Sequence, residues 1–192
     1  MNKVLLIASG LSANQYKDYD YKSNGWTIVA INNGWQITND WSHWIRPPDY
    51  KGMRPKALSR HQKIVERYSI QILKYGGQNA CGFSITLTAG YWSLSELNPD
   101  VIGFLGADMN YTPDKNGKTH IYGVGHDIKA NGISDPDRMV KVYGKNDPDY
   151  LKNIYMRFHD IAKDEGCAVY NFSTDENTRL PYTKAHPKDF DQ

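Results

Sequence analysis

Short runs of apolar residues, several of them unbroken by polar ones, are the feature that most constrains the fold of this chain. Unbroken apolar runs are typical of strands that are buried on both faces of a parallel sheet. The predicted strands cover residues 4–8, 26–31, 43–45, 70–73, 101–105 and 168–171. Helical patterns lie between them, at residues 54–68, 84–97 and 147–166. Strands that alternate with helices predict an α/β fold, with a mostly parallel sheet flanked by helices.

The length and composition of the chain limit its organisation and its partners. At 192 residues, without an internal repeat or a long linker, the chain is expected to form a single domain over residues 1–192. The first apolar run is too short for a signal peptide, and no segment approaches the roughly 20 apolar residues of a membrane span. We therefore expect a cytoplasmic protein with no membrane span. A net charge of +2 neither demands nor forbids a polyanionic partner.

Cysteines, aromatic residues and two acidic segments each allow two interpretations. Cys81 and Cys167 lack metal-ligand spacing, so we expect packing residues and no metal site. The chain has 14 tyrosines and five tryptophans, which suit stacking on sugars or bases but also serve core packing, and we favour packing. Asp-Pro-Asp at 135–137 and 147–149 has the spacing of a divalent-metal motif, but it is also typical of a helix start, which we favour.

Polar residues follow the first two predicted strands. Gly10 and Ser12 come after the first apolar run, and Asn32 and Asn33 after the second. The carboxyl ends of parallel strands form one edge of the sheet, and open α/β sheets bind ligands there. Gly10 can bring backbone amides close to a nucleotide or can simply let the chain turn. Asn32 can read a base or ribose hydroxyls, whereas Asn33 begins an Asn-Gly pair, which favours a turn.

The segment after the predicted strand at 101–105 is the most informative part of the chain. It contains, within two dozen residues, Asp108, Tyr111, Lys118, His120, Tyr122, His126 and Asp127. This density of acid, base and phosphate-binding side chains predicts a long functional loop, or lid, over the site. Histidine titrates near neutral pH, so His120 and His126 are the candidate general bases. Within the loop, residues 114–118 have the composition of a hairpin tip.

Six short motifs occur in one order along the chain. They read IASGLS, IVAINN, ACGFSI, GFLGADMNY, THIYG and VYNFSTDENTRLPY. In this order they resemble the motifs of the bacterial sialyltransferase-like glycosyltransferases and of the related nucleotide-binding Rossmann proteins, over nearly the whole chain. The resemblance implies a single Rossmann-like domain that binds a nucleotide-activated sugar as its substrate and needs no separate cofactor.

The resemblance also implies roles for particular residues. The nucleotide would be bound by Gly10, Ser12, Asn32, Gly82, Asp108, Asn171 and Ser173. Tyr111 and Tyr122 would bind the leaving phosphate through their hydroxyl groups, in place of a metal ion. The family places a catalytic histidine shortly before its last long helix, but the matching stretch here, KVYGKNDPDY, contains none. The expected base is therefore His120, His126 or Asp108, or else the chemistry is different.

Three functions remain open from the sequence. The leading hypothesis is a metal-independent glycosyltransferase that passes a sugar from a nucleotide to a hydroxyl acceptor, either a glycan or a modified base in DNA. A second is a magnesium-dependent pyrophosphate or nucleotidyl transferase, with Asp108 and Asp127 as metal ligands. A third is a nucleotide- or nucleic-acid-binding module without catalysis. Because the chain is short for the first of these functions, we expect a homo-oligomer or another partner to complete the acceptor region.

Overall fold

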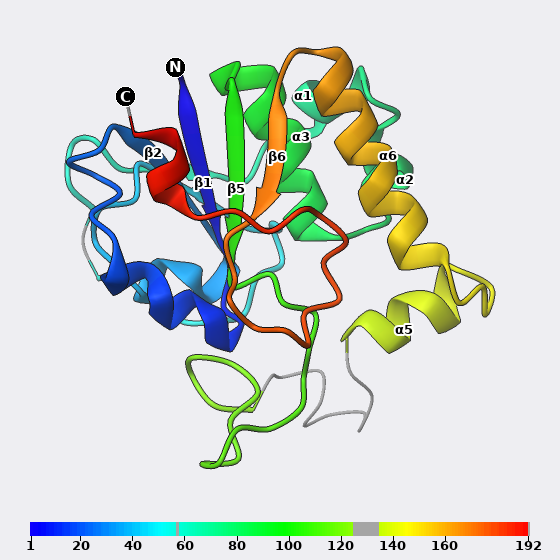
Figure 1. Cartoon of the computed structure of the whole chain (residues 1–192). Helices are drawn as coiled ribbons and strands as arrows, with labels where there is room; N and C mark the ends of the chain where they lie inside the picture. Colours follow the sequence, from blue (N-terminus) through cyan, green and yellow to red (C-terminus); the bar gives the residue numbers. More distant parts are fainter. Residues whose placement is uncertain (57, 125–134, 192) are drawn as a thin grey trace.

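A six-stranded parallel sheet forms the centre of the computed structural model, which describes residues 1–56, 58–124 and 135–191 (Figure 1). Its strands are β1 (Lys3–Ile7), β2 (Trp26–Ile31), β3 (His43–Ile45), β4 (Lys63–Val65), β5 (Val101–Leu105) and β6 (Ala168–Asn171). Each pairing between them is parallel, and their order is β4-β3-β2-β1-β5-β6. The predicted α/β fold, with a parallel sheet flanked by helices, is confirmed, and it is Rossmann-like.

The strand order changes direction beside β1. From β1 the chain runs outward through β2 and β3 to β4, and it then returns to β5 on the other side of β1. In the register of the sheet, Leu5 lies between Ile28 of β2 and Gly103 of β5. The loops that leave β1 and β5 therefore diverge at the carboxyl edge, and a crevice between such loops is the usual ligand site of open α/β sheets.

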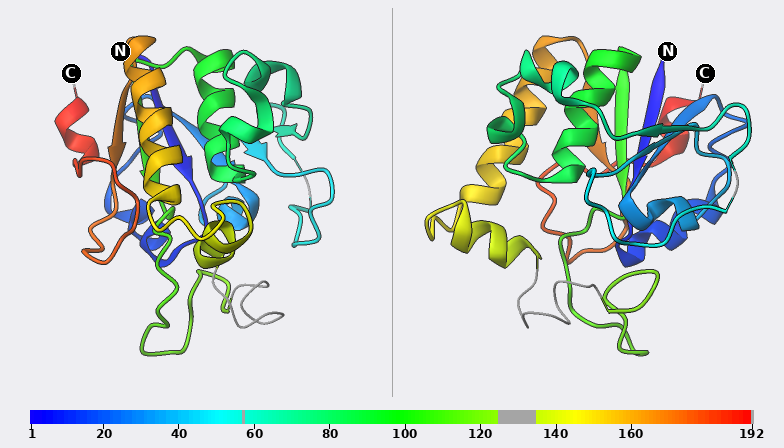
Figure 2. Two further views of the ribbon diagram at one scale, coloured as in Figure 1. Left: turned by 90° about the vertical axis from the view of Figure 1, so that its right-hand side faces the viewer. Right: turned by 180° about the vertical axis from the view of Figure 1, so that it is seen from behind.

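The described α-helices are gathered on one face of the sheet (Figure 2). They are α1 (Ser69–Leu73), α2 (Gly77–Ala80), α3 (Ile85–Leu97), α5 (Asp135–Val142) and α6 (Tyr150–Asp164). Three 3-10 helices pack on the other face, namely η1 (Leu11–Asp18), η2 (Asn32–Gln36) and η3 (Pro187–Phe190). The two faces are thus covered by different kinds of structure.

Alternate residues of the strands contribute to two apolar cores. Val4 and Leu6 of β1 belong to the core beneath α3 and α6, together with the fully buried Phe158. Leu5 and Ile7 belong to the core on the other face. The aromatic members of that second core are Tyr19, Tyr21, Trp26, Trp41, Trp44 and Phe172. Large aromatic side chains thus cover the face that the α-helices do not, which confirms that much of the aromatic content serves packing.

Two predicted elements are wrong. Residues 70–73, predicted as a strand, lie in the helix Ser69–Leu73, which buries mainly Ile72. No described residue of the predicted helix at 54–68 is helical, and its residues Lys63–Val65 form β4 instead. Pairing with β3 outweighs the helical pattern there, because adjacent β-branched residues suit the pleated edge of a sheet.

The other two predicted helices are confirmed, although the second begins later than expected. α3 begins after Ser84, whose hydroxyl accepts a hydrogen bond from the first turn, and it ends at Asn98, with a φ of 44°. α6 begins after Asp149. Asp147 is not the N-cap of α6, because its carboxylate accepts the Asp149 N–H at 2.9 Å in a turn that precedes the helix. Gly166, with a φ of 79°, follows the end of α6 as predicted.

The two edges of the sheet differ in how they are finished. The β4 edge is three residues long and begins with the exposed Lys63. Along the β6 edge, the C-terminal segment runs parallel to the strand through a bridge between Asn171 and Lys184. Asn171 donates its N–H to the Thr183 carbonyl at 2.9 Å and accepts the Ala185 N–H at 3.2 Å. The chain itself therefore covers the end of β6.

Both cysteines are buried free thiols, as predicted. Burial raises the pKa of Cys81 to about 11 and that of Cys167 to about 12. In the parts of the chain that the structure describes, no helix has the length and apolar character needed to cross a membrane.

The packing of α6 on the sheet can be tested through Phe158, which is fully buried and makes edge-to-face contact with Tyr91 and Phe104. We expect Phe158→Ala to lower the free energy of unfolding by about 3–5 kcal/mol, since it removes a buried ring and leaves a cavity. Urea denaturation measures this loss. Leu73→Ala is the control, because Leu73 is 70% exposed and its loss should change stability by no more than about 0.5 kcal/mol. Equal effects of the two variants would contradict the central position of Phe158.

Candidate functional site

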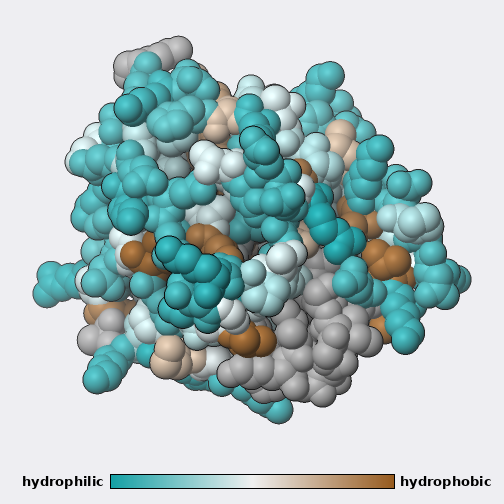
Figure 3. Space-filling model, turned by 60° about the horizontal axis from the view of Figure 1, so that its bottom comes forward, coloured by the Kyte–Doolittle hydropathy of each residue, from teal (hydrophilic) through white to brown (hydrophobic). Residues whose placement is uncertain are grey.

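A cavity of about 450 Å³ opens at the carboxyl edge of the sheet. Loops after β1, β2, β3 and β5 line it, together with the first turn of α3. Figure 3 shows this end of the molecule, where hydrophilic residues cover most of the visible surface and hydrophobic residues form small, separate patches. The volume is within the usual range of small-molecule sites, and the position is the one that the strand order favours.

Six of the residues singled out in the sequence lie in the cavity wall. They are Gly10, Asn32, Asp108, Tyr111, His120 and Tyr122. Four others do not line the cavity, namely Ser12, Gly82, Asn171 and Ser173. His126 and Asp127 fall outside the described residues. The structure therefore brings together residues from three predicted strand-end segments that are far apart in the sequence.

Gly10 brings the loop after β1 against the loop after β5. Its N–H donates to the Gly106 carbonyl at 2.7 Å. A Cβ at position 10 would lie 2.6 Å from that carbonyl oxygen and 2.6 Å from Oδ2 of Asp108. The φ of Gly10 is −63°, which any residue can adopt, so the close approach of the two loops is what requires glycine here.

Asp108 ties these two loops together from the inside. Its Oδ2 accepts the backbone N–H of Ser12 at 3.0 Å, and its Oδ1 accepts the Ser12 hydroxyl. The same hydroxyl oxygen accepts the Gly106 N–H at 3.0 Å. Asp108 is almost fully buried, and this burial raises the pKa of its carboxyl group, although hydrogen bonds from Ser12 and Ser173 oppose the shift.

The remaining predicted residues support the cavity from behind. Asn171 accepts the Ser173 N–H at 2.9 Å and so shapes the loop after β6, which packs against Asp108 through the Arg179 N–H at 2.8 Å from the Asp108 carbonyl. Gly82 has a φ of 55°, and a Cβ there would lie 2.6 Å from Ile154 of α6. Glycine at this position therefore lets α6 approach the start of α3.

The long loop after β5 folds back onto the loop after β1. Its residues 106–124 contain no helix or strand beyond isolated bridges, and residues 114–118 form the predicted tight turn, in which the Asp114 N–H donates to the Lys118 carbonyl at 2.8 Å. Gly10 and His120 form an antiparallel bridge, and the Ile121 N–H donates to the Ser9 carbonyl at 3.0 Å. The loop is thereby fixed against the cavity.

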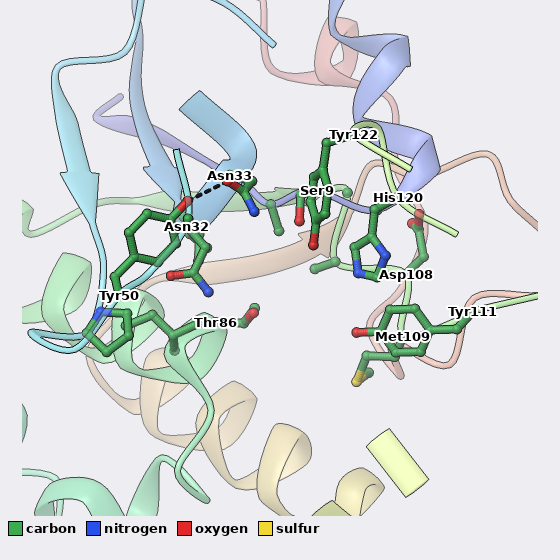
Figure 4. Close-up of a pocket in the computed structure, with 18 of the residues that line it drawn as sticks. Ser9, Asn32, Asn33, Tyr50, Thr86, Asp108, Met109, Tyr111, His120 and Tyr122 are labelled. Carbon is green, nitrogen blue, oxygen red and sulfur yellow. Dashed lines mark hydrogen bonds between the residues drawn. The ribbon is translucent and has the colours of Figure 1, made fainter. Parts of the chain in front are cut away.

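Three rings are stacked in this part of the wall. The His120 imidazole lies 4.8 Å from the Tyr111 ring, at an interplanar angle of 27°, and 5.2 Å from the Tyr122 ring, at 30°. Figure 4 shows the imidazole between the two tyrosines, on the side of the cavity where Asp108 and Met109 also lie. A titratable ring is thus held in a defined orientation at the cavity surface.

Asn32, Tyr50 and Thr86 lie across the cavity from the ring stack (Figure 4). The Tyr50 hydroxyl donates to Oδ1 of Asn33. Sequence reasoning missed Tyr50, together with the other lining residues of the loop after β3, which are Pro47, Asp49, Lys51 and Gly52. The strand at 43–45 was predicted, so the rule that ligands bind after strand ends could have identified this loop as well.

Asn32 presents an unused hydrogen-bond acceptor. Its backbone has a φ of 48°, and its carbonyl accepts the Trp44 indole N–H at 2.6 Å, which fixes the residue in place. Its side-chain Oδ1 is buried and has no hydrogen-bond partner among the described residues. A buried acceptor without a donor costs free energy, so a ligand that donates an N–H or O–H here would be favoured.

The first turn of α3 contributes Ile85 and Thr86 to the wall. The N–H groups of a first helical turn lack intrahelical partners and carry a partial positive charge, which favours anions. The first turn of α3 has no acidic residue. Among the described lining residues, Lys51 carries a full positive charge, whereas Asp49 and Asp108 are acidic.

The described residues include no group of three or more His, Cys, Asp or Glu side chains arranged to hold a metal ion. In comparisons with known proteins, no family model, no curated protein and no solved structure matches this chain. The six-motif resemblance is therefore supported here at the level of the Rossmann-like fold.

The burial of Asp108 predicts a pH dependence of stability. A carboxyl group whose pKa is raised on folding binds its proton more tightly in the folded state, so the stability it contributes is present at low pH and is lost as the pH rises through the raised pKa. We therefore expect the free energy of unfolding of the unmodified protein, minus that of Asp108→Asn, to fall between about pH 4 and neutrality. Urea denaturation across this range measures the difference.

Asp114→Asn is the matched control for this experiment. Asp114 lies in the exposed tight turn, where hydrogen bonds from the backbone of Lys118 and Asn116 lower the pKa of its carboxyl group. The corresponding difference for Asp114→Asn should therefore rise with pH over the acidic range. Trends of the same sign for the two variants would contradict the assignment for Asp108.

Proposed function

We propose that this chain is a glycosyltransferase that takes a sugar from a nucleotide donor and passes it to a hydroxyl acceptor without a metal ion. The observation that carries the proposal is the position of His120, clamped between two tyrosines in the wall of a cavity at the carboxyl edge of the sheet. Such an edge is where Rossmann-like sheets bind nucleotides, and a fixed imidazole beside it suits proton transfer.

The nucleotide part of the donor would occupy the cavity between Gly10 and Asn32. Oδ1 of Asn32, buried and without a described partner, suits a ribose hydroxyl or an exocyclic amine of the base. Gly10 keeps the backbone of the loop after β1 low enough for close contact. The first turn of α3 supplies N–H groups that favour the negative charge of the donor.

The transfer step assigns the reacting atoms to the ring stack. The imidazole of His120 takes the proton of the acceptor hydroxyl, while the hydroxyl oxygen forms a bond to the anomeric carbon of the sugar. The bond between that carbon and the phosphate oxygen breaks, and the nucleotide leaves with the electron pair. Tyr111 and Tyr122 donate hydrogen bonds to the phosphate, which is the part that a metal ion plays in other transferases.

His120 is a better candidate for the base than Asp108. Both carboxylate oxygens of Asp108 already accept hydrogen bonds from Ser12, and its side chain joins two loops. Asp108 would therefore hold the site in shape while His120 handles the proton. The acceptor is a glycan or a modified base in DNA, and both offer the required hydroxyl group.

A thermal-shift screen tests the donor. The protein is heated with cytidine, uridine, guanosine and adenosine nucleotides and with their sugar conjugates, each in magnesium and in chelator. A ligand at 100 times its dissociation constant should stabilise the fold by about 2.7 kcal/mol. We expect one nucleotide class to raise the melting temperature equally in both conditions, and Asn32→Ala to reduce this shift.

The other outcomes of the screen would favour other functions. A shift with triphosphates that needs magnesium would favour pyrophosphate or nucleotidyl transfer. A shift with nucleotides but no product from any sugar conjugate would favour a binding module without catalysis. No shift with any nucleotide would overturn the proposal.

His120→Ala tests the base once a donor is known. We expect turnover to fall by about 10²–10⁴-fold, which is the usual contribution of a general base, with the thermal shift by the donor retained. His159→Ala is the control, since His159 lies on α6 and does not line the cavity. Turnover that survives in His120→Ala would remove His120 from the mechanism.

A further inference from the structure

We propose that Thr119 is a positioning residue that holds the imidazole of His120 in the tautomer needed for a base, an inference that rests on the proposed function. Thr119 is 2% exposed and precedes His120 in the long loop. Its hydroxyl oxygen lies 2.9 Å from Nδ1 of His120. The contact involves the imidazole nitrogen nearer the backbone, and so it leaves Nε2 for the reaction.

The surroundings of Thr119 set the direction of this hydrogen bond. Its hydroxyl oxygen lies 3.5 Å from the carbonyl oxygen of Gly123, and that carbonyl also accepts the N–H groups of Thr119 and His120, at 3.1 and 2.8 Å. A carbonyl oxygen only accepts, so a hydroxyl beside it directs its single proton there. The lone pairs of the hydroxyl oxygen then accept the proton of Nδ1–H.

This arrangement determines which nitrogen of His120 can act as the base. A neutral imidazole carries one proton, and with that proton on Nδ1 the lone pair is on Nε2. The rings of Tyr111 and Tyr122 stack on the imidazole and oppose a rotation that would exchange the two nitrogens. After proton uptake at Nε2, Nδ1–H continues to donate to Thr119, so no rearrangement accompanies the transfer.

The tautomer can be measured without any substrate. Histidine labelled with ¹⁵N gives different nitrogen chemical shifts for the protonated and the unprotonated ring nitrogen, and a spectrum recorded at alkaline pH reports the neutral imidazole. Loss of one signal set in His120→Gln assigns the resonances. We expect Nδ1 of His120 to be protonated and Nε2 to be unprotonated.

Three variants separate the hydroxyl from the shape of the side chain. Thr119→Ser keeps the hydroxyl and should keep the Nδ1–H tautomer. Thr119→Val keeps the shape and loses the acceptor, so the proton should move to Nε2, where free histidine prefers it. Thr119→Ala serves the same purpose if the valine variant fails to fold. An Nε2–H tautomer in the unmodified protein, or an unchanged tautomer in Thr119→Val and Thr119→Ala, would overturn the inference.

Turnover provides the second readout and separates this inference from the proposed function. With a donor from the thermal-shift screen, Thr119→Val should lower turnover about tenfold or more while donor binding and the folded structure are retained, and Thr119→Ser should restore it. If the tautomer shifts as expected but no variant or unmodified protein forms product, the proposed transferase function fails and the positioning of His120 by Thr119 stands.

Discussion

The contact between Ser12 and Asp108 determines the shape of the carboxyl edge on which the rest of the site depends. Two strand-end loops meet there, and the Ser12 backbone and hydroxyl satisfy both oxygens of a buried carboxylate. This meeting needs the missing side chain of Gly10, whose position is filled by Asp108 and by the Gly106 carbonyl. The bridge between Gly10 and His120 then places the ring stack beside the junction. A polar tie in the floor of the cavity thus precedes, in structural terms, the groups that would carry out the chemistry.

The sequence predicts strands well where both faces of the strand are buried. The runs at 26–31, 43–45, 101–105 and 168–171 correspond in full to strands of the sheet, because burial on two sides leaves an unbroken apolar signal. The edge strand β4 gives no such signal, since its Lys63 and Ile64 are exposed. Its existence depends on pairing with β3, which a local pattern does not contain. The run at 70–73 is apolar for another reason: it belongs to a short helix with several exposed apolar residues.

The candidate site was predicted in part because strand ends converge by topology. Gly10, Asn32 and Asp108 each follow a predicted strand, and all three line the cavity. Pattern alone does not distinguish a lining residue from a supporting one. Ser12 shares a motif with Gly10, yet it points into the protein towards Asp108, and this orientation depends on how the two loops pack. The loop after β3 was missed because it contains no motif, although Tyr50 forms much of the facing wall.

The unequal edges of the sheet bear on how copies of this protein can associate. Exposed backbone N–H and C=O groups on a long edge strand invite a strand from another molecule, which leads to ribbons and aggregates. Here the end of β6 is occupied by the protein's own C-terminal segment, and β4 offers only a short edge with Lys63 at its start. Continuous extension of the sheet from one molecule to the next is therefore disfavoured at both sides. Self-association of this chain would have to use side-chain surfaces instead, so that its concentration in solution can rise without strand-to-strand polymerisation.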